Sequence, residues 1–380
     1  MSETAADRHA LIALVAADGA CAPRRTLLER HAGPAAALAA GAAAWREAGL
    51  DPAQIAALRA PDAMALARTQ AWLASPGRHL LGWGHPDYPA LLRRAPNPPL
   101  ALFVAGDPVR LWHPAVAVVG SRAPTPGGRD NAADFARALA GAGLGVTSGL
   151  AAGIDTAAHQ AALDAGGLTV AVLGTGPDLA YPRANAALHA RIAEAGAVVS
   201  EHLPGTQGRP SHFPSRNRII AGLSLGTLVV EAAERSGALI TARLAAEAGR
   251  EVFALPGSIH NPLARGCHRL IRDGAALVES AAELSEALAP LAQELAADLR
   301  LRLNAPIQCG HTFVTRPVQD ERLEDRDYQS LWNALGHDPT GMDRLVERTG
   351  LTPAVLSSML LLMELEGRVA AQHGRYFRNR

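Results

Sequence analysis

The sequence contains no lysine, so all 36 of its basic side chains are arginines. An equal number of acidic residues brings the formal net charge to zero. Zero net charge argues against a protein covered in nucleic acid, so any anion site must be a local patch. Every cation that could build such a patch is a planar, permanently charged guanidinium, which suits phosphate and carboxylate groups.

Cysteine is also scarce, because Cys21, Cys267 and Cys309 lie far apart and without CxxC spacing. We therefore expect reduced thiols, a cytoplasmic protein and no zinc site. No cluster of His, Asp or Glu has metal-ligand spacing, so no metal is expected. The first twenty residues place acidic residues before a short apolar run and are not typical of a signal peptide. No apolar run reaches the about 18 residues of a membrane span, so no membrane association is predicted.

The length of 380 residues allows two or three domains, and 48% hydrophobic residues allow a sizeable core. Residues 1–76 read as short, alanine-rich helices separated by Gly, Pro and Asp, which predicts a helical (SAM/HhH-like) domain. Such a domain serves either as a plain bundle or as a module that binds a nucleic-acid backbone. Its loops carry no strong signature for the second role.

Apolar strands and helices alternate through residues 77–285. The runs "AVAVVGS" (115–121), "LTVAVLGTG" (168–176) and "GTLVVEAA" (226–233) are typical of buried strands, and helix patterns separate them. This alternation predicts an α/β domain with a doubly wound, mostly parallel sheet covered on both faces, an extended Rossmann-like fold.

The C-terminal part changes character again. Residues 286–325 begin with a helical pattern and become polar, and we interpret them as a linker. Residues 326–380 give helices, a Gly350 turn, a further helix and a hairpin with Gly374 at its turn, the pattern of a winged-helix domain. The third helix offers Thr, Ser and Met without a basic or amide cluster. Both duplex-DNA reading and protein interaction therefore stay open for this domain.

Gly-rich and polar residues follow the predicted strands at their carboxyl ends, where open parallel sheets bind ligands. Glycines admit close approach of a backbone, and N–H groups at helix starts face anions. Neither G-x-G-x-x-G nor G-x-x-x-x-G-K-[ST] is present, which argues against a dinucleotide cofactor or a P-loop. We therefore predict a site for a sugar-phosphate chain, without a cofactor. It comprises Gly120, Ser121, Arg122, Ser148, Gly149, Gly153, Phe213, Arg216, Asn217, Arg218, Arg235, Ser236 and Gly237.

Structural roles compete with these functional ones. Arg216 and Arg218 either meet an anionic ligand or hold neighbouring loops together. Asp155 either caps the helix that follows it or holds Arg122, and Glu231 is a candidate partner for either of the two arginines. His159 is interpreted as an ordinary helix residue rather than a ligand. Ser121 and Ser148 have no matched histidine in sequence, so no nucleophile is predicted.

Several motifs in fixed order resemble the DNA-processing protein A (Smf/DprA-like) family of bacterial natural transformation. They span most of residues 80–280 and are "DYPALL…PNPPLALFVAGD" (87–107), "VAVVGSRAPTPGG" (116–128), "TSGLAAGIDTAAHQAAL" (147–163), "AVLGTGPDLAYPRANAAL" (171–188), "FPSRNRIIAGLS" (213–224), "VVEAAERSGALITARLAAEAGREVFALPG" (229–257) and "RGCHRLIRDGAALV" (265–278).

The resemblance implies a non-enzymatic protein that binds single-stranded DNA in a basic pocket of the Rossmann-like domain. It also implies protection of incoming strands, loading of the RecA recombinase, and a homodimer formed through the same domain. By the resemblance, Arg122 becomes the leading phosphate-binding residue. Phe213 and Tyr181 lie on the same rim, where they either stack on bases or pack their loops against the core. Ser148, Gly149 and Gly153 would shape the pocket floor, and Phe213, Arg216, Asn217 and Arg218 would continue it. Separately from the resemblance, Asp155, Glu201 and Glu231 are predicted to be supporting, structural residues.

Two other functions stay open. Rossmann-like nucleotide phosphoribohydrolases carry a PGGxGTxxE motif. Here Pro126–Gly128 lies far from Gly226-Thr227, and Glu231 comes one residue too late, which argues against this enzyme class. The other alternative is a winged-helix transcription regulator in which the α/β domain acts as a sensor.

Overall fold

A computed structural model of the chain describes residues 4–303, 326–335, 340–352, 355–356, 359–360, 363–364, 368–372 and 375–378. The chain forms two compact units, Met1–Ile307 and Gln308–Arg380. In the part of the chain described, no helix has the length and apolar character needed to cross a membrane.

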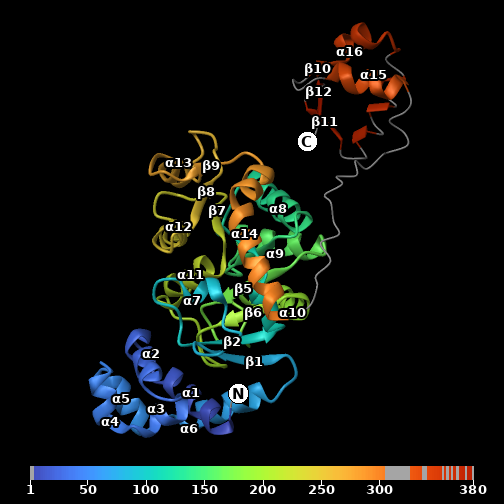
Figure 1. Cartoon of the computed structure of the whole chain (residues 1–380). Helices are drawn as coiled ribbons and strands as arrows, with labels where there is room; N and C mark the ends of the chain where they lie inside the picture. The colour runs from blue at the N-terminus through green and yellow to red at the C-terminus, as the bar shows by residue number, and fades with distance from the viewer. Residues whose placement is uncertain are drawn as a thin grey trace. The chain divides into compact units, whose positions relative to one another are not determined.

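The first unit begins with a layer of helices, which lies beside the edge of the sheet that β1 forms (Figure 1). Asp51 starts one of them as a capping box, because its carboxylate accepts a hydrogen bond from the Gln54 N–H at 2.8 Å. The layer buries its own apolar side chains together with Phe103 of the sheet, so it packs directly on the α/β body. Its helices are α1 (Ala5–Ala16), α2 (Cys21–Arg30), α3 (Pro34–Ala39), α4 (Gly41–Glu47), α5 (Pro52–Arg59) and α6 (Ala63–Leu73).

A nine-stranded sheet follows, in the order β1-β2-β6-β5-β4-β3-β7-β8-β9. Only the pairs β1–β2 and β2–β6 are antiparallel, which confirms the predicted doubly wound, mostly parallel sheet. The sequence did not predict β1, because a short antiparallel edge strand breaks the strand–helix alternation. The strands are β1 (Arg78–Gly82), β2 (Ala101–Gly106), β3 (Ala115–Val119), β4 (Gly145–Ser148), β5 (Thr169–Leu173), β6 (Ala197–Ser200), β7 (Gly226–Val229), β8 (Glu251–Ala254) and β9 (Ala276–Leu277).

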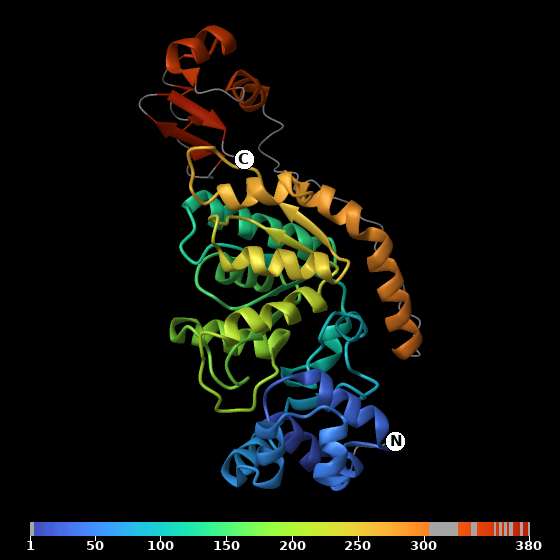
Figure 2. The same cartoon turned by 90° about the vertical axis from the view of Figure 1, so that its left-hand side faces the viewer.

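Alternate residues of β3 point to opposite faces of the sheet, each covered by helices. Val116 and Val118 face α8, α9 and α14, whereas Ala117 and Val119 face α11 and α12. Figure 2 looks onto this second face, where α11 (yellow-green) and α12 (yellow) lie side by side in front of the sheet. The covering elements are α7 (Ala90–Arg93), η1 (Pro108–Trp112), α8 (Pro126–Gly141), α9 (Ile154–Asp164), η2 (Arg183–Asn185), α10 (Ala186–Ala195), α11 (His212–Leu223), α12 (Gly237–Glu247), α13 (Arg265–Arg272) and α14 (Ala281–Leu303).

Helix α14 corrects the interpretation of residues 286–325 as a linker. Its Leu284, Leu288 and Leu295 are buried in the core cluster that also holds β3 and α8. These positions form one stripe of an amphipathic helix. Residues 286–303 therefore belong to the α/β body, and residues 304–325 lie outside the described part.

The second unit contains α15 (Arg326–Leu335), β10 (Thr340–Gly341), α16 (Met342–Thr349), β11 (Val369–Gln372) and β12 (Arg375–Arg378). The strands form a small antiparallel sheet in the order β10-β12-β11, so the predicted hairpin is present. Leu331, Leu345 and Leu360 share its core. The Gly374 turn and most of the predicted third helix lie outside the described residues.

His159 is a packed helix residue, as the sequence interpretation held. Its Nδ1 lies 2.6 Å from the Thr169 hydroxyl, which itself donates to the Val146 carbonyl at 2.8 Å. The imidazole therefore donates from Nδ1, and its buried Nε2 has no partner among the described residues. Burial lowers the pKa of His159 to about 3, so the ring is neutral in the folded protein.

We expect Leu288→Ala to lower the free energy of unfolding by about 2–5 kcal/mol, because it leaves a cavity beneath α14. Urea titration followed by circular dichroism measures this. The exposed Glu286→Ala on the same helix is the control and should change stability little. Equal stability of both variants would show that α14 does not belong to the core.

His159 predicts a pH dependence of stability. The unfolded chain takes up a proton near the ordinary pKa of about 6.5, whereas the folded ring does not. Its contribution is therefore complete above pH about 6.5 and is lost as the pH falls from there toward 3, by up to about 1.4 kcal/mol per pH unit. His159→Asn, whose amide can still donate to Thr169, should reduce this slope in urea titrations between pH 7 and 5. The same slope in both proteins would contradict the assignment.

Candidate nucleic-acid interface

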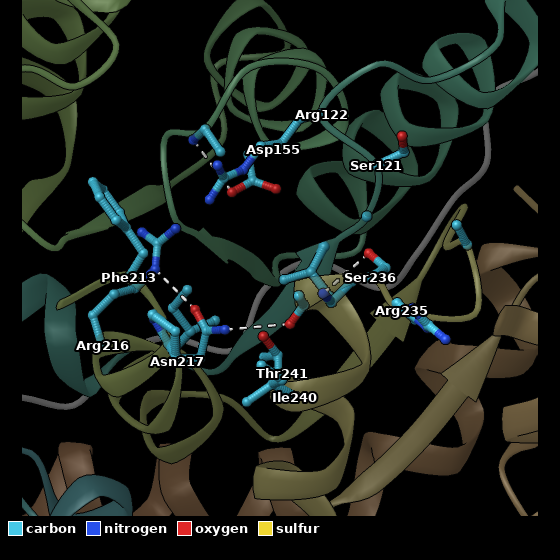
Figure 3. A pocket seen from close by; sticks show the side chains of 18 of the residues that line it. Ser121, Arg122, Asp155, Phe213, Arg216, Asn217, Arg235, Ser236, Ile240 and Thr241 are labelled. Atoms are coloured by element: carbon cyan, nitrogen blue, oxygen red, sulfur yellow. Dashed lines mark hydrogen bonds between the residues drawn. The ribbon is translucent and has the colours of Figure 1, made fainter. Parts of the chain in front are cut away.

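A cavity of about 680 Å³ opens at the carboxyl ends of β3 and β7 (Figure 3). The chain continues from β3 outward through β4, β5 and β6 on one side, and β7 starts the other side. This is the point where the strand order reverses, the usual ligand site of a doubly wound sheet. Its walls come from the loops after β3, β4 and β7 and from the first turns of α11 and α12.

The turn after β3 holds Arg122 at the rim. The Ser121 N–H donates to the Glu231 carbonyl at 2.7 Å, and the Ser121 carbonyl accepts from the Ile154 N–H at 3.1 Å. Gly153 has a φ of +85°, and a Cβ there would overlap the Ser121 carbonyl. Gly153 therefore supports this turn from behind, while the Arg122 side chain is exposed to solvent.

The Glu231 carboxylate ties together three of the loops around the cavity. It accepts hydrogen bonds from the Thr125 N–H at 2.9 Å, the Thr125 hydroxyl at 2.6 Å and the Asn261 amide at 3.2 Å. A Cβ at Gly128 would overlap this carboxylate, so a glycine is needed there. The expectation that Glu231 pairs with Arg216 or Arg218 is therefore wrong, because its oxygens are used by uncharged donors.

Arg216 lies buried beneath the loop after β4. Its Nη1 donates to the carbonyls of Gly149 and Val172, and its Nε donates to Asn217 Oδ1 at 2.9 Å. A Cβ at Gly149 would overlap the guanidinium, so only glycine fits there. Burial lowers the pKa of Arg216 to about 10, with a smaller effect of Arg122 in the same direction. Arg216 therefore stays charged at neutral pH as part of the cavity floor.

Asp155 supports the same loop rather than holding Arg122. Its carboxylate accepts from the Gly149 N–H at 3.0 Å and from the Ala151 N–H at 3.3 Å. Burial raises the pKa of Asp155, and the charge of Arg216 opposes that shift. The two buried charges partly balance each other under the cavity.

Two residues predicted to bind the ligand face elsewhere. Arg218 leaves the cavity and forms a two-pronged ion pair with Glu201, with an Nη1–Oε1 distance of 3.0 Å and both side chains 13% exposed. Ser148 is fully buried and donates to the Val118 carbonyl at 2.6 Å. Both are structural residues. The Ser148 side chain, at the end of β4, points into the sheet, and the Arg218 side chain, on α11, points toward the end of β6.

Aromatic and cationic side chains stack at the rim. The ring centroids of Tyr181 and Phe213 are 4.9 Å apart, and the Arg122 guanidinium carbon lies 5.8 Å from the Phe213 centroid. Tyr181 is 50% exposed, so the stack offers a flat surface to solvent. The sequence analysis identified both rings only because Tyr181 and Phe213 follow predicted strand ends; it did not predict that they stack.

The first turn of α12 forms the opposite wall of the cavity. The Ser236 hydroxyl caps it by accepting from the Ala238 N–H at 3.3 Å, and Arg235 and Gly237 are exposed beside it. Helix starts carry a partial positive charge that favours anions. The sequence analysis missed Thr241, one turn further along α12, because a threonine within a helix looks like any helical residue. Its spacing of four from Gly237 was the available signal.

Most of the predicted site residues meet at this cavity. Gly120, Ser121, Arg122, Asp155, Phe213, Arg216, Asn217, Arg235, Ser236 and Gly237 line it, and Gly149 lines an adjoining hollow next to Arg122. Among the described residues, no group of three His, Cys, Asp or Glu side chains is placed to hold a metal ion.

Most of the chain is similar to known proteins. Residues 79–289 match the family described as DNA recombination-mediator protein A, and residues 315–375 match the DprA winged helix domain. Protein Smf of Escherichia coli is 42% identical over 310 residues, which cover 81% of this chain and 79% of that protein. The X-ray structure of DNA processing protein A from Streptococcus pneumoniae matches with a TM-score of 0.66 and 36% identity, over 74% of this chain and 98% of that one.

We expect Arg218→Ala to lower the free energy of unfolding by about 1–3 kcal/mol, because it leaves the Glu201 carboxylate half-buried and unpaired. Its effect on ligand binding should be small, since the pair lies outside the cavity. Urea titration and a binding titration measure the two effects.

Arg191→Ala is the matched control, because its ion pair with Asp164 is largely exposed and should contribute under about 1 kcal/mol. Strongly weakened ligand binding by a stable Arg218→Ala protein would contradict the structural role.

Proposed function

Since the chain belongs to the DNA recombination-mediator protein A family, whose members include the Smf and DprA proteins, we propose that it binds single-stranded DNA in the cavity between β3 and β7. The observation that carries this proposal is the stack of Arg122, Phe213 and Tyr181 at the rim. It combines a cation with two aromatic rings, the half-buried Phe213 and the exposed Tyr181, and cations and aromatic rings are the pair of features by which proteins hold unpaired strands.

The proposed division of roles follows from exposure. Arg122 and Arg235 are exposed and can meet phosphates, and the start of α12 adds the backbone N–H group of Gly237. The Ser236 N–H is not available, because it donates to the Ala233 carbonyl at 3.0 Å. Phe213 and Tyr181 offer their ring faces to bases, each stacked base contributing about 1–3 kcal/mol. Only an unpaired strand presents its base faces in this way, so a duplex should bind more weakly.

The protein acts in this proposal by binding rather than by turnover. The Glu231 carboxylate, the candidate for the glutamate of a phosphoribohydrolase, is 7% exposed and already accepts three hydrogen bonds. It is a poor candidate for an acid or base on a substrate. We further propose, from the family, that the protein acts in the cytoplasm as a homodimer, protects incoming strands during natural transformation and loads the RecA recombinase onto them.

We expect Arg122→Ala to weaken binding of oligo-dT about tenfold at low salt, through loss of a charge-assisted phosphate contact. It should also make the slope of log affinity against log salt shallower by about 0.7. Fluorescence anisotropy with labelled oligo-dT, repeated at several salt concentrations with an equal-length duplex as competitor, measures both. Because Arg122 is exposed, folding stability should not change.

Arg137→Ala removes another exposed arginine, on α8 and outside the cavity, and serves as the control, with affinity unchanged. Wild-type affinity in the Arg122→Ala protein would contradict the assignment. Failure of the wild-type protein to bind oligo-dT at low salt would remove the proposed function. Release of free base from a nucleoside monophosphate would then favour the phosphoribohydrolase.

A further inference from the structure

A second cavity, of about 440 Å³, lies where the helices α1–α6 meet the α/β body. The helices contribute the end of α1 and the residues around the start of α6, and the body contributes the start of β2, the residues after β6 and the start of α11. Cavities of about 300–1,000 Å³ are of the size that small organic ligands occupy. In the described part of the chain, the second cavity shares no lining residue with the cavity between β3 and β7, so it is a separate site.

The three acidic side chains that line the second cavity each have a positive counterpart. Glu201 forms the ion pair with Arg218. Asp62 caps the start of α6, where its carboxylate accepts from two backbone N–H groups. Burial lowers the pKa of Arg24, and the charge of Asp18 is among those that oppose this shift, so Asp18 stabilises the buried guanidinium. The acids therefore leave the other cations of the second cavity uncompensated.

Two of the three arginines that line the second cavity keep free N–H groups. Arg24 is 3% exposed and donates to backbone carbonyls at the end of α1, including that of Leu14 at 2.8 Å, so it supports the wall. Arg68, on α6, donates from Nε to the Pro204 carbonyl at 2.8 Å, and its other two nitrogens have no partner among the described residues. The exposed Arg209 side chain likewise has no partner within the part of the chain described.

The two free arginines approach the second cavity from different parts of the fold. Arg68 belongs to the helical layer, whereas Arg209 belongs to the loop between β6 and α11. Figure 2 shows this yellow-green loop beside the blue helices, where Arg68 joins it to α6. Two unpaired guanidinium groups at one cavity favour a doubly charged anion such as a phosphate monoester.

Two stacked imidazole rings and buried apolar side chains also line the second cavity. The ring centroids of His202 and His212 are 4.0 Å apart, with the ring planes 19° from parallel. Burial lowers the pKa of His202, so this ring is neutral at neutral pH. His212 donates from Nδ1 to the Gly174 carbonyl at 3.0 Å, which leaves Nε2 of the neutral ring as an acceptor. Leu100 and Leu203 are buried beside them. Imidazoles and apolar groups suit a flat organic ring, since histidine is among the side chains that stack on nucleobases.

We infer that the second cavity binds a free nucleoside monophosphate, with its phosphate at Arg68 and Arg209 and its base against the imidazoles of His202 and His212. A phosphate monoester carries about −1.5 to −2 charges at neutral pH, which two guanidinium groups match. Inorganic phosphate would leave the apolar part of the wall without a partner. The inference goes beyond the proposed function, because it concerns a small molecule and a cavity other than the one proposed for the strand.

The test is a calorimetric titration of the full chain with dTMP, and with thymidine as the ligand that lacks the phosphate. The protein is first saturated with oligo-dT, so that the cavity between β3 and β7 is occupied. We expect Arg209→Ala and Arg68→Ala each to weaken binding of dTMP about tenfold, through loss of a charge-assisted contact. Both variants should leave the weaker binding of thymidine unchanged. Arg209→Ala removes no protein contact among the described residues, so its folding stability should not change.

Arg46→Ala is the matched control. Arg46 is an exposed arginine on α4 of the same helical layer, and it does not line the second cavity. Its affinity for dTMP should equal that of the wild-type protein. An equal loss of affinity in all three arginine variants would mean a general effect of net charge and would overturn the inference.

The remaining outcomes separate the inference from the proposed function. Wild-type affinity for dTMP in both Arg209→Ala and Arg68→Ala overturns the nucleotide site, as does a wild-type protein that does not bind dTMP. Binding of dTMP that oligo-dT abolishes also overturns it, because the nucleotide then uses the cavity of the strand. A wild-type protein that does not bind oligo-dT contradicts the proposed function alone, since the dTMP titration is then carried out without the strand.

Discussion

The buried guanidinium of Arg216 is the interaction on which the architecture of the cavity depends. It holds the carbonyls of Gly149 on β4's loop and Val172 on β5, and it orients the Asn217 amide within α11. Nothing larger than glycine fits at position 149 above it. A lysine could not replace it, because a single ammonium group cannot donate in three directions fixed in one plane. The hydrogen bonds of the cavity floor thus require an arginine, which is compatible with a chain that contains no lysine.

Glu231 extends this framework to the other side of the cavity. The arginine connects the loop after β4 to strand β5, and the carboxylate connects the loops after β3, β7 and β8. Each buried charge is met by several hydrogen bonds, which is the condition under which proteins keep buried charges. The framework therefore does not depend on Arg122 and Arg235, the exposed arginines at the rim. Structural and ligand-facing cations are separated by burial, although they are the same residue type.

The sequence predicted the fold well, because a parallel sheet covered on both faces has a simple signature. Apolar runs such as 115–121 alternate with helices, and glycines mark the strand ends. It also predicted residues that line one cavity, since the carboxyl ends of parallel strands meet at one edge. It did not predict β1 or the packing of α14. The first is an edge strand outside the alternation, and the second depends on which face of the helix meets the core.

Within the site, the sequence-based predictions failed for residues whose role depends on the direction in which the side chain points. Arg216 and Arg218 are two positions apart on α11, which turns them by about 200° relative to each other. They therefore meet different surroundings, the cavity floor for one and Glu201 for the other. Thr241 was overlooked for the same reason, because its exposure to the cavity depends on how α12 is rotated. Spacing along a chain identifies a rim, but the rotation of each helix selects the side chains that reach it.

The glycine-supported turn beneath Arg122 also bears on which partner changes shape when a strand binds. Gly153 and the backbone hydrogen bonds of Ser121 hold this turn in place. The loops therefore lose little conformational freedom when the cavity is occupied. In the proposed complex the flexible polynucleotide would be the component that becomes ordered, so the unfavourable entropy of association should arise mainly in the DNA. A strand whose bases are already unstacked should then bind with a smaller entropic penalty than one stacked in solution.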